Sequence, residues 1–452
     1  MTTCVVALGK IGLPLAVQIA SKGEAVIGVD INQEVVDLVN AGIEPFPGET
    51  GLAERLKDVL KAGNLEATTD TRAAVSRSDC VVIVVPVVVD SEANPDFSAI
   101  DAATTEIAHG LKKGCLISYE TTLPIGTTRN RFLPMLESVS NLSCGSDFFL
   151  AYSPERVFSG RIFSDLRTYP KLVGGIDERS TERALDFYNS VLDFDERHDL
   201  EKPNGVWNLG NCEASEMAKL VETTYRNVNI ALANEFALHA EHLGIDINPI
   251  IEASNSQPFS HVHNPGIAVG GHCIPVYPKF YLSTDNEATL PASSIAVNES
   301  MPKQAVHRLF GSAKDALAGK RVVVLGAAYR NGVKETAFSG VFPLVDEIEL
   351  LGGIAVVHDP LYSEEELLAL GLVEFQLGSQ CDAAIVQTDH EMYRDLTASD
   401  LPGAEIIYDG RGIVDIAKLS PIEVVVLGVG CCYEGFKCCR RKAPIHKTCS
   451  AA

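Results

Sequence analysis

The sequence lacks a hydrophobic run long enough to cross a lipid bilayer. Its longest apolar stretch, residues 80–89, is interrupted by Pro86 and is shorter than the roughly 18 residues that a transmembrane helix requires. We therefore expect this stretch to form a buried strand. The start of the chain also lacks a basic segment followed by an apolar one, because strand-like sequence begins at Cys4. These absences predict a cytoplasmic protein without a membrane partner.

Basic residues are also scarce. The chain has 37 Lys and Arg against 60 Asp and Glu, which gives a formal net charge of −23. A surface of this sign repels the phosphate backbone of DNA and RNA, so no nucleic-acid partner is expected. The remaining composition, with 46% hydrophobic and 21% charged residues, is that of an ordinary globular protein. At 452 residues the chain is long enough for two or three domains.

Most of the 12 cysteines are too scattered to form a disulfide framework. Seven are spread singly between Cys4 and Cys381, which is typical of reduced thiols. The other five crowd into residues 431–452, whose composition differs from the rest of the chain. Adjacent cysteine pairs in this tail lack the C-x₂₋₄-C spacing of zinc sites. We expect a disordered tail and no metal.

The order of apolar runs and glycine turns predicts an α/β fold with two Rossmann-like domains, each with a doubly wound parallel sheet. Strand, turn, helix and strand follow one another from Cys4 to Asp30, and the same alternation restarts near Lys320. Between them, residues 211–243 carry apolar side chains at helical spacing and contain no Gly or Pro. Such a helix would be about 45 Å long and could join two domains and form the spine of a homodimer.

We therefore predict four segments. Residues 1–200 form the first Rossmann-like domain, 201–300 a central helical domain, 301–430 a second Rossmann-like domain, and 431–452 the tail.

The first glycine turn resembles a dinucleotide-binding fingerprint. Gly9 and Gly12 follow the first strand, and Asp30 closes the second. Turn glycines let a pyrophosphate approach backbone N–H groups, and the acid accepts hydrogen bonds from the ribose. Asp30 would repel a 2′-phosphate, which favours NAD over NADP. Ala7 stands where the fingerprint has its first glycine, so a plain strand-to-helix turn stays an alternative.

A second motif lies in residues 265–280, PGIAVGGHCIPVYPKF. Cys273 follows two glycines and precedes a proline, which holds it on a tight loop, whereas Cys4, Cys80 and Cys381 lie in strand-like sequence and suit core packing. A thiolate on such a loop is a candidate nucleophile if a cation or a helix N-terminus lowers its pKa. His272, beside it, is more typical of a substrate contact than of a catalytic base.

Several motifs in register resemble the UDP-glucose/GDP-mannose dehydrogenase family over roughly residues 3–415. They read, in order, ALGKIGLPLA, VVIVVPVVVDSEANPDFSAID, YETTLPIGTTR, YSPERVFSG, AKLVETTYRNVNIALANEFA, GGHCIPVYPKF and VVVLGAAYR. The HCI in GGHCIP is more similar to the branch that oxidises UDP-N-acetylhexosamines, such as UDP-N-acetylmannosamine, than to the UDP-glucose enzymes.

The resemblance implies an NAD-dependent four-electron oxidation of the sugar C6 alcohol to a carboxylate, with NAD bound by the domain at residues 1–200 and the UDP-sugar by the domain at 301–430. The first hydride transfer would give an aldehyde. Cys273 would add to it and form a thiohemiacetal, a second hydride transfer would give a thioester, and water would release the acid. The matching motifs imply Cys273, Lys219, Glu155 and Thr122 as catalytic residues. They imply Gly9, Ile11, Gly12, Asp30, Pro86 and Thr122 for the cofactor and Arg156, Lys219, Thr223, His272, Arg330 and Lys334 for the substrate.

Three positions depart from the family pattern. Thr223 replaces an asparagine that follows the lysine, Tyr277 replaces an aspartate that follows the cysteine, and Ala337 replaces a basic nucleotide contact. A phenol with a pKa near 10 is a poor base at neutral pH, so proton transfer would shift to Lys219, Glu155 or a water held by Thr122. Arg330 and Lys334 are nearby substitutes for the missing cation.

Three alternative functions stay open. The chain could be a UDP-glucose 6-dehydrogenase, a two-electron hydroxy-acid dehydrogenase that has no use for Cys273, or a silent protein that binds a nucleotide sugar. The number of NADH formed for each sugar separates the two enzyme classes, and binding without NADH formation would indicate the third.

Overall fold

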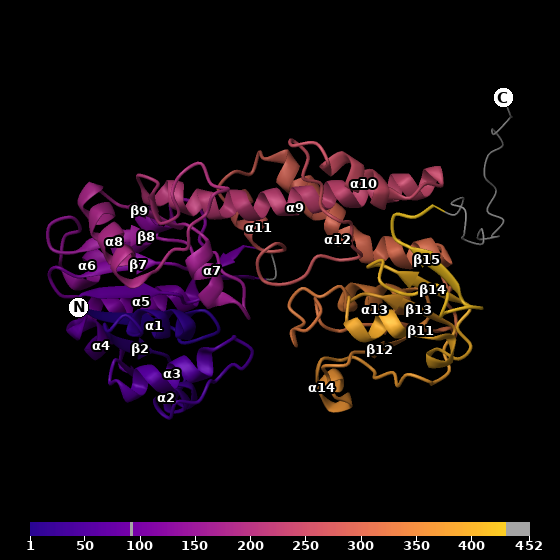
Figure 1. Ribbon diagram of the computed structural model, residues 1–452, viewed down its shortest axis with the longest axis horizontal. Helices are drawn as coiled ribbons and strands as arrows, with labels where there is room; N and C mark the ends of the chain where they lie inside the picture. The colour runs from indigo at the N-terminus through magenta and orange to yellow at the C-terminus, as the bar shows by residue number, and fades with distance from the viewer. Residues whose placement is uncertain (91–93, 431–452) are drawn as a thin grey trace. The chain divides into compact units, whose positions relative to one another are not determined.

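The structure is a computed structural model, and it describes residues 1–90 and 94–430 (Figure 1). Contacts between residues divide the chain into two compact units. The first comprises Met1–Thr223 and Lys279–Glu287, and the second begins with Thr224–Pro278 and resumes at Ala288. The predicted tail at 431–452 lies outside the described residues. The compact units divide at Thr223, which is neither of the domain boundaries predicted at residues 200 and 300. Those two boundaries stay a prediction.

The first unit is built on an eight-stranded sheet in the order β10-β9-β8-β7-β4-β1-β2-β3. The strands are β1 (Thr2–Val6), β2 (Ala25–Val29), β3 (Leu65–Thr68), β4 (Cys80–Ile83), β7 (Leu116–Tyr119), β8 (Phe149–Tyr152), β9 (Lys171–Gly175) and β10 (Val206–Asn208). The helices of this unit are α1 (Gly12–Ala20), α2 (Gln33–Asn40), α3 (Leu52–Lys61), α4 (Thr71–Arg77), α5 (Ser98–Gly110), α6 (Leu133–Ser140), α7 (Ile162–Thr168) and α8 (Glu178–Val191), with a π-helix at Thr128–Phe132. Its core includes Val5, Leu15, Val82, Leu116 and Phe187, all 0–2% exposed.

The strand order places several loops together. β1 pairs in parallel with both β2 and β4, and β4 and β8 both pair in parallel with β7. The chain order therefore reverses between β1 and β4, which is where doubly wound sheets bind ligands at the carboxyl ends of their strands. The loops that follow β1, β2, β4, β7 and β8 all leave the sheet at this edge.

Two details differ from the predicted all-parallel sheet. β9 pairs antiparallel to β8 and parallel to β10, so its first residue, Lys171, lies at the edge where β8 and its parallel neighbours end. The buried strand expected over residues 80–89 ends at Ile83, because Pro86 cannot donate to a ladder. Beyond it, β5 (Val88–Val89) pairs with β6 (Pro95–Asp96) in a separate two-stranded ribbon.

The second unit repeats the architecture on a smaller scale. Its five strands are all parallel in the order β12-β11-β13-β14-β15. They are β11 (Arg321–Leu325), β12 (Ile354–His358), β13 (Ala383–Val386), β14 (Ile406–Asp409) and β15 (Glu423–Val426). The helices are α10 (Ile247–Asn255), α12 (Thr289–Phe310), α13 (Val341–Leu350) and α14 (Glu364–Ala369). The α/β fold with two Rossmann-like sheets predicted from the sequence is confirmed.

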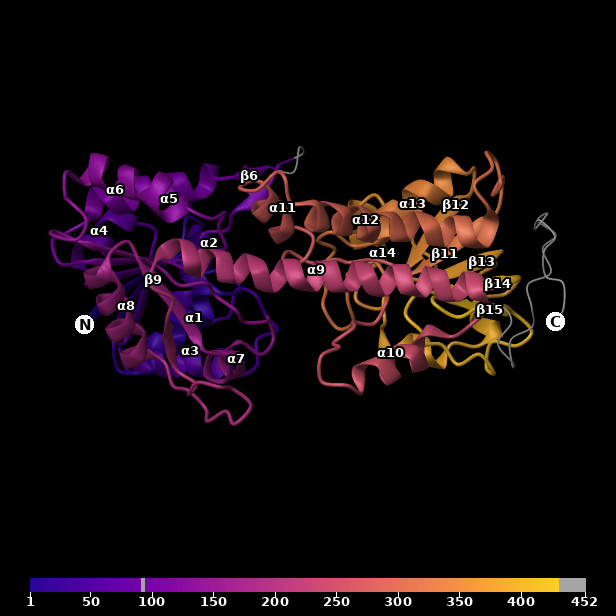
Figure 2. The ribbon, with the colours of Figure 1, turned by 90° about the horizontal axis from the view of Figure 1, so that it is seen from above.

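Helix α9 (Cys212–Leu243) is the 32-residue spine predicted from the apolar spacing, and it runs without interruption (Figure 2). Its buried face is unexpectedly polar. Asn227, Asn229 and Asn234 are at most 8% exposed, whereas Tyr225 and Phe236 are 53% and 43% exposed. Polar side chains on a buried face need hydrogen-bond partners, and those of α9 hold neighbouring loops.

Ala7 gives a test of the first turn. It stands in the left-handed region, with φ 78°, a conformation that costs an L-residue about 1–2 kcal/mol. Glycine would remove this strain but would raise the conformational entropy of the unfolded chain, which offsets part of the gain. Ala7→Gly should therefore stabilise the first unit by about 0.5–1 kcal/mol. Urea unfolding followed by the fluorescence of Trp207, the single tryptophan, which lies in β10 of the same unit, measures the change.

A matched variant supplies the control. Ala102 is exposed in the middle of α5, so Ala102→Gly should destabilise the same unit by about 1 kcal/mol. A destabilised Ala7→Gly variant would show that the turn does not require the left-handed conformation.

Candidate active site

The turn between β1 and α1 is open to a bound anion. Ile11, the N-cap of α1, makes no side-chain capping bond to the first helical N–H groups. A Cβ on Gly12 would lie 1.9 Å from the carbonyl oxygen of Ala7, so only glycine fits there, and a Cβ on Gly9 would meet no atom within 4 Å. This turn therefore leaves room for a pyrophosphate beside the N-terminus of α1 and fits a dinucleotide.

Asp30 lies directly after β2, as the fingerprint predicts. Its Oδ2 accepts the N–H of Leu8 at 2.8 Å and its Oδ1 accepts that of Asn32 at 2.9 Å. The carboxylate is partly exposed, so it keeps lone pairs for a ribose hydroxyl. Asp30 thus orders the turn and presents a negative charge beside it.

The loops that carry Pro86 and Thr122 lie side by side. The hydroxyl of Thr121 donates to the carbonyl of Val85 at 2.7 Å, which joins the loop after β7 to the loop after β4. Thr122 is 7% exposed. The sheet order therefore brings Gly9, Pro86 and Thr122 to neighbouring loops at one edge of the sheet, as the motifs predict.

Glu216, which sequence reasoning missed, anchors the Thr122 loop to α9. Its carboxylate accepts the N–H of Gly126 at 2.5 Å, and the N–H and hydroxyl of Thr128 at 2.9 and 2.7 Å. Burial raises the pKa of this carboxyl to about 7. Lys219 follows one helical turn later and is 7% exposed. Glu216 therefore fixes the loop relative to the helix that carries Lys219.

Glu155 belongs to a buried cluster of charges. The Nζ of Lys171 lies 2.9 Å from its Oε2 and 2.7 Å from Oε2 of Glu120. Tyr188, on α8, donates its hydroxyl to Oε1 of Glu120 at 2.6 Å. The Lys171 ammonium lowers the pKa of Glu155, whereas burial raises that of Glu120 to about 7. Glu155 lines a small pocket with Arg156 and Lys171.

Two predicted substrate residues of the first unit already have intramolecular partners. Nε of Arg156 donates to Oε2 of Glu222 at 2.8 Å, and another of its nitrogens donates to the carbonyl of Pro170. The hydroxyl of Thr223 lies 3.0 Å from the carbonyl of Lys219, so it bonds back to its own helix. A substrate contact by either side chain would compete with these bonds.

Cys273 lies on a loop that tolerates little change. Cβ atoms on Gly270 and Gly271 would lie 2.5 and 3.0 Å from the side chain of Tyr329, and Gly271 has φ 87°. The N–H of Gly271 donates to the carbonyl of Ala337 at 2.8 Å. The cysteine is thus held by close backbone packing on the second unit. Ala337, which carries no basic group, contributes to this loop through its carbonyl.

Helix α9 supports the same loop from another side. Nδ2 of Asn227 donates to the carbonyl of Ile274 at 3.3 Å, and the carbonyl of Cys273 accepts the N–H of Tyr277 at 2.9 Å. Tyr277 begins the short helix α11 (Tyr277–Leu282). The residue that replaces the expected aspartate is therefore part of the helix that follows the cysteine.

Exposure distinguishes Cys273 from the other described cysteines. Among residues 1–90 and 94–430 it is the one exposed thiol, and the other six are buried or half-buried. Burial raises the pKa of each of these six, to about 11 for Cys144 and Cys381, which keeps them protonated. Cys273 is the cysteine best placed to act as a nucleophile.

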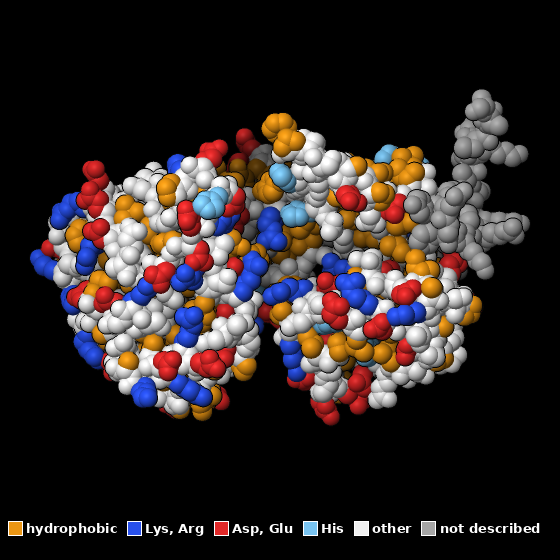
Figure 3. All heavy atoms as spheres, viewed as in Figure 1, with side chains coloured by type: hydrophobic (Ala, Val, Ile, Leu, Met, Phe, Trp, Pro, Cys, Tyr) orange, Lys and Arg blue, Asp and Glu red, His pale blue; other side chains and the backbone are white. Residues whose placement is uncertain are grey.

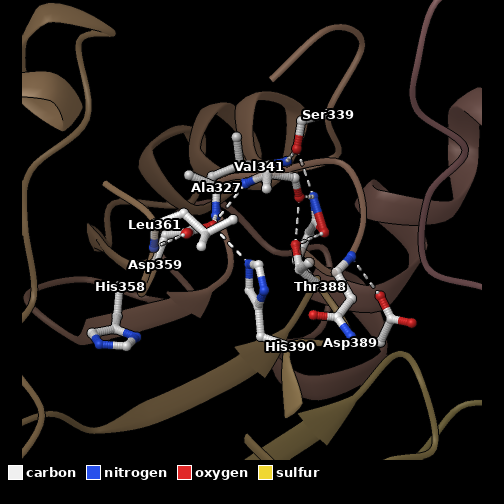
Figure 4. Close-up of polar contacts among 12 residues, drawn as sticks. Ala327, Ser339, Val341, His358, Asp359, Leu361, Thr388, Asp389 and His390 are labelled. Atoms are coloured by element: carbon white, nitrogen blue, oxygen red, sulfur yellow. Dashed lines mark hydrogen bonds and ion pairs between the residues drawn. The ribbon is translucent and has the colours of Figure 1, made fainter. Parts of the chain in front are cut away.

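The carboxyl edge of the second sheet holds a hydrogen-bond network (Figure 4). Asp359, directly after β12, accepts the N–H groups of Ala327 and Ala328 at 2.8 Å, and Nε2 of His390 lies 3.1 Å from the same oxygen. Thr388, after β13, donates to the carbonyl of Ala328. These bonds fix the loop after β11, which carries the predicted substrate residues Arg330 and Lys334.

The predicted cations of this loop lie near aromatic rings. The guanidinium of Arg330 lies 5.8 Å from the ring centre of Tyr329, and the ammonium of Lys334 lies 5.3 Å from that of Tyr362 and pairs with Glu366. His272 lies 2.6 Å from Glu335 through Nε2. His272, Arg330 and Lys334 therefore belong to the second unit with Cys273, whereas Thr122, Glu155, Lys219 and the NAD residues belong to the first.

The described parts of the chain offer no metal site. Residues 1–90 and 94–430 contain no cluster of three His, Cys, Asp or Glu side chains that could hold a metal ion. Within the same residues, no helix is long and apolar enough to span a membrane.

Acidic and basic side chains are mixed over the face of the first unit that Figure 3 shows.

Comparison with known proteins identifies three consecutive domains. Residues 1–192 match the NAD binding domain of the UDP-glucose/GDP-mannose dehydrogenase family, residues 213–301 its central domain and residues 323–416 its UDP binding domain. A UDP-N-acetyl-D-mannosamine dehydrogenase of Pyrococcus horikoshii is 34% identical over 437 residues, which cover 95% of this chain and 99% of that protein.

Solved structures give the same picture. The structure of UDP-D-ManNAc dehydrogenase from Pyrococcus horikoshii matches with a TM-score of 0.82 and 32% identity, covering 95% of this chain and 99% of that one. An NDP-N-acetyl-D-galactosaminuronic acid dehydrogenase from Methanosarcina mazei matches with a TM-score of 0.78 and 27% identity over 95% of both chains. The NAD cofactor predicted from Gly12 and Asp30 is confirmed. This chain is an NAD-dependent nucleotide-sugar dehydrogenase and belongs to the UDP-glucose/GDP-mannose dehydrogenase family.

Proposed function

We propose that the protein oxidises the C6 alcohol of a UDP-N-acetylhexosamine, UDP-N-acetylmannosamine above all, to the uronic acid in a four-electron reaction. The observation that carries the proposal is the exposure of Cys273, the one exposed thiol among the described cysteines. Close backbone packing fixes its loop, and the chain is an NAD-dependent enzyme. A two-electron alcohol oxidation needs no such thiol. The sugar is inferred from relatives named as UDP-N-acetyl-D-mannosamine dehydrogenases at 30–34% identity.

Cys273 acts as the covalent nucleophile in this proposal. NAD, when bound, accepts one hydride in each of the two oxidation steps. Between them the Cys273 thiolate adds to the C6 aldehyde, whose oxygen takes up a proton, and forms a thiohemiacetal. Loss of the second hydride and of this hydroxyl proton leaves a thioester, and water cleaves it to the carboxylic acid and the free thiol. The covalent bond keeps the aldehyde in the site until it is oxidised.

Lys219, Glu155 and Thr122 supply the remaining chemistry. The ammonium of Lys219 stabilises negative charge that develops on the C6 oxygen. Glu155, whose pKa is lowered by Lys171, is ionised at neutral pH and accepts protons from the alcohol or from water. Thr122 lies on the loop after β7, which Thr121 joins to the loop after β4, and orients the water. Tyr277 takes no part as a base.

Substrate contacts are proposed on both units. The nucleotide and the sugar are bound by Arg330, Lys334 and His272 of the second unit. Arg156 and Thr223 of the first unit also bind the substrate, and each gives up an intramolecular hydrogen bond to do so. The free thiols of the described residues are consistent with the reducing cytoplasm, where we place the reaction.

Replacement of Cys273 tests the covalent step. Cys273→Ser should allow the first hydride transfer but block the second oxidation, because a serine alkoxide is much harder to form than a thiolate. Carboxylate production should fall by about a thousandfold or more, on the order of 4 kcal/mol in activation free energy. Mass spectrometry of the products and of the protein should detect aldehyde or a trapped ester.

Cys144→Ser is the matched control, since this half-buried thiol lies far from the Cys273 loop in sequence and should leave carboxylate production unchanged. Unchanged uronic acid formation by Cys273→Ser would show that Cys273 is only a loop residue, and the reaction would then need another nucleophile.

Asp30 should set the choice of cofactor. Asp30→Ala removes a charged acceptor for the ribose hydroxyls, which is worth about 1.5–3 kcal/mol, so NAD should bind roughly 10- to 100-fold more weakly. Discrimination against NADP should relax, because the repulsion of the 2′-phosphate is lost. Glu34→Gln removes a neighbouring exposed charge in α2 and serves as the control. Equal use of both cofactors by the unmodified enzyme would contradict the assignment.

We also propose that α9 forms a homodimer. Its exposed face carries a contiguous row of apolar side chains at helical spacing, which are Met217, Val221, Tyr225, Leu232 and Phe236, each 42–53% exposed. A second copy of the same helix would cover this row symmetrically, whereas in a monomer it would face water.

Charge placed in this row should separate the subunits. We expect the unmodified protein to be a dimer by light scattering at micromolar concentration and the double variant Leu232→Asp, Phe236→Asp to be a monomer. Leu368→Asp, at a 68% exposed leucine of α14, is the control and should remain dimeric. A monomeric unmodified protein would rule out the proposed dimer.

A further inference from the structure

The sheet of the first unit places two carboxyl groups beside each other. Glu120 directly follows β7 and Glu155 follows β8, the parallel neighbour of β7, with the N–H of Glu155 donating to the carbonyl of Glu120 at 3.2 Å. Their side chains lie within hydrogen-bonding reach of each other. Two ionised carboxylates contain no donor, so a proton added to the pair forms a hydrogen bond between them.

One cation serves both carboxyl groups. Lys171 is the first residue of β9, which enters this edge because it runs antiparallel to β8. Its ammonium lies 2.7 Å from Glu120 and 2.9 Å from Glu155, and its side chain is 4% exposed. With both glutamates ionised the cluster has a charge of −1, and with one proton added it is neutral. Uptake of one proton by the ionised pair therefore removes the net charge of this buried site.

Burial decides which carboxyl group holds the proton. The Glu120 side chain is 0% exposed, whereas that of Glu155 is 11% exposed and lines the pocket. Desolvation raises the pKa of Glu120, and the Lys171 ammonium lowers that of Glu155. A proton that arrives on Glu155 therefore moves downhill to Glu120.

The other groups around Glu120 do not compete for this proton. Tyr188, on α8, donates to Glu120, and the thiol of Cys80, on β4, is buried; burial raises the pKa of both, so they stay protonated. The guanidinium of Arg156 donates to Glu222. The backbone N–H of Arg156 donates to the Glu155 carboxylate at 2.7 Å. Glu120 is thus the group of the cluster to which Glu155 can pass a proton.

We propose that Glu120 receives the proton that Glu155 takes up during turnover, while Lys171 holds both carboxyl groups in place. This inference rests on the proposed function of Glu155 as the base. The transfer moves one proton and no electrons: the O–H bond at Glu155 breaks, an O–H bond forms at Glu120, and the negative charge returns to Glu155. Glu155 is then ready for the next proton. Reverse transfer through Glu155 and the pocket returns the stored proton to water.

Glu120→Gln tests the transfer, because the amide mimics the protonated carboxyl but accepts no proton. We expect kcat with UDP-N-acetylmannosamine and NAD to fall about 10- to 100-fold, within the range of acid–base contributions, with KM nearly unchanged. The acid limb of the kcat–pH profile should move to lower pH, toward the titration of Glu155. Tyr188→Phe removes a donor to ionised Glu120 and should move this limb to higher pH.

Tyr119→Phe is the control for loss of a buried phenol. Its hydroxyl lies 2.8 Å from that of Thr104, outside the cluster, so the variant should keep the pH profile of the unmodified enzyme. An unchanged profile in Glu120→Gln, with the unmodified enzyme active, would overturn the inference and leave the proposed function intact. Failure of the unmodified enzyme to reduce NAD with any UDP-sugar would instead refute the proposed function.

Infrared spectroscopy gives a readout that needs no activity. The difference spectrum between mildly acidic and alkaline pH should contain a carboxylic acid C=O band from Glu120, which disappears in Glu120→Gln. Glu216 is a second buried carboxyl whose pKa is raised, so Glu216→Gln identifies its separate contribution. A spectrum of Glu120→Gln identical to that of the unmodified protein would refute a protonated Glu120.

Discussion

A buried ammonium shared by two buried carboxyl groups is the constraint on which the proposed chemistry of the first unit depends. Lys171 cannot be left unpaired at 4% exposure, since an uncompensated buried charge costs several kcal/mol. Its position follows from the antiparallel pairing of β9 with β8, because β9 begins at the edge where β8 ends. The same contacts fix Glu155 and set its protonation. The direction of β9 thus determines the surroundings of Glu155, the proposed base.

Helix α9 contributes a second constraint, because its polar residues face inward. Glu216 holds the Thr122 loop, and Asn227 holds the loop of Cys273. Asn234 accepts the N–H of Gly266 further along the same segment. Each buried amide or carboxylate needs these partners, so the helix cannot rotate without breaking them. Large apolar residues such as Tyr225 and Phe236 are left on the outside, which is the physical basis for the proposed subunit contact.

Local sequence patterns predicted much of this molecule. The βαβ alternation, the Gly9–Asp30 turn and the length of α9 are all consequences of short-range spacing, and the structure has each of them. The Cys273 loop was found because a cysteine between glycines and a proline is unusual. The Lys171–Glu120 contact was missed because it joins residues 51 positions apart through strand pairing. A lysine leading a buried apolar run, KLVGG, is the signal that could have indicated a buried partner.

The proposed roles depend on one claim, that each sugar is oxidised twice within the same site. The most direct measurement is the number of NADH molecules formed for each UDP-N-acetylmannosamine consumed, by absorbance with a limiting amount of sugar, beside UDP-glucose, UDP-N-acetylglucosamine and GDP-mannose. The account predicts two NADH per sugar, with UDP-N-acetylmannosamine as the best substrate and the uronic acid as the product. One NADH per sugar, with an aldehyde or ketone as the product, would contradict it.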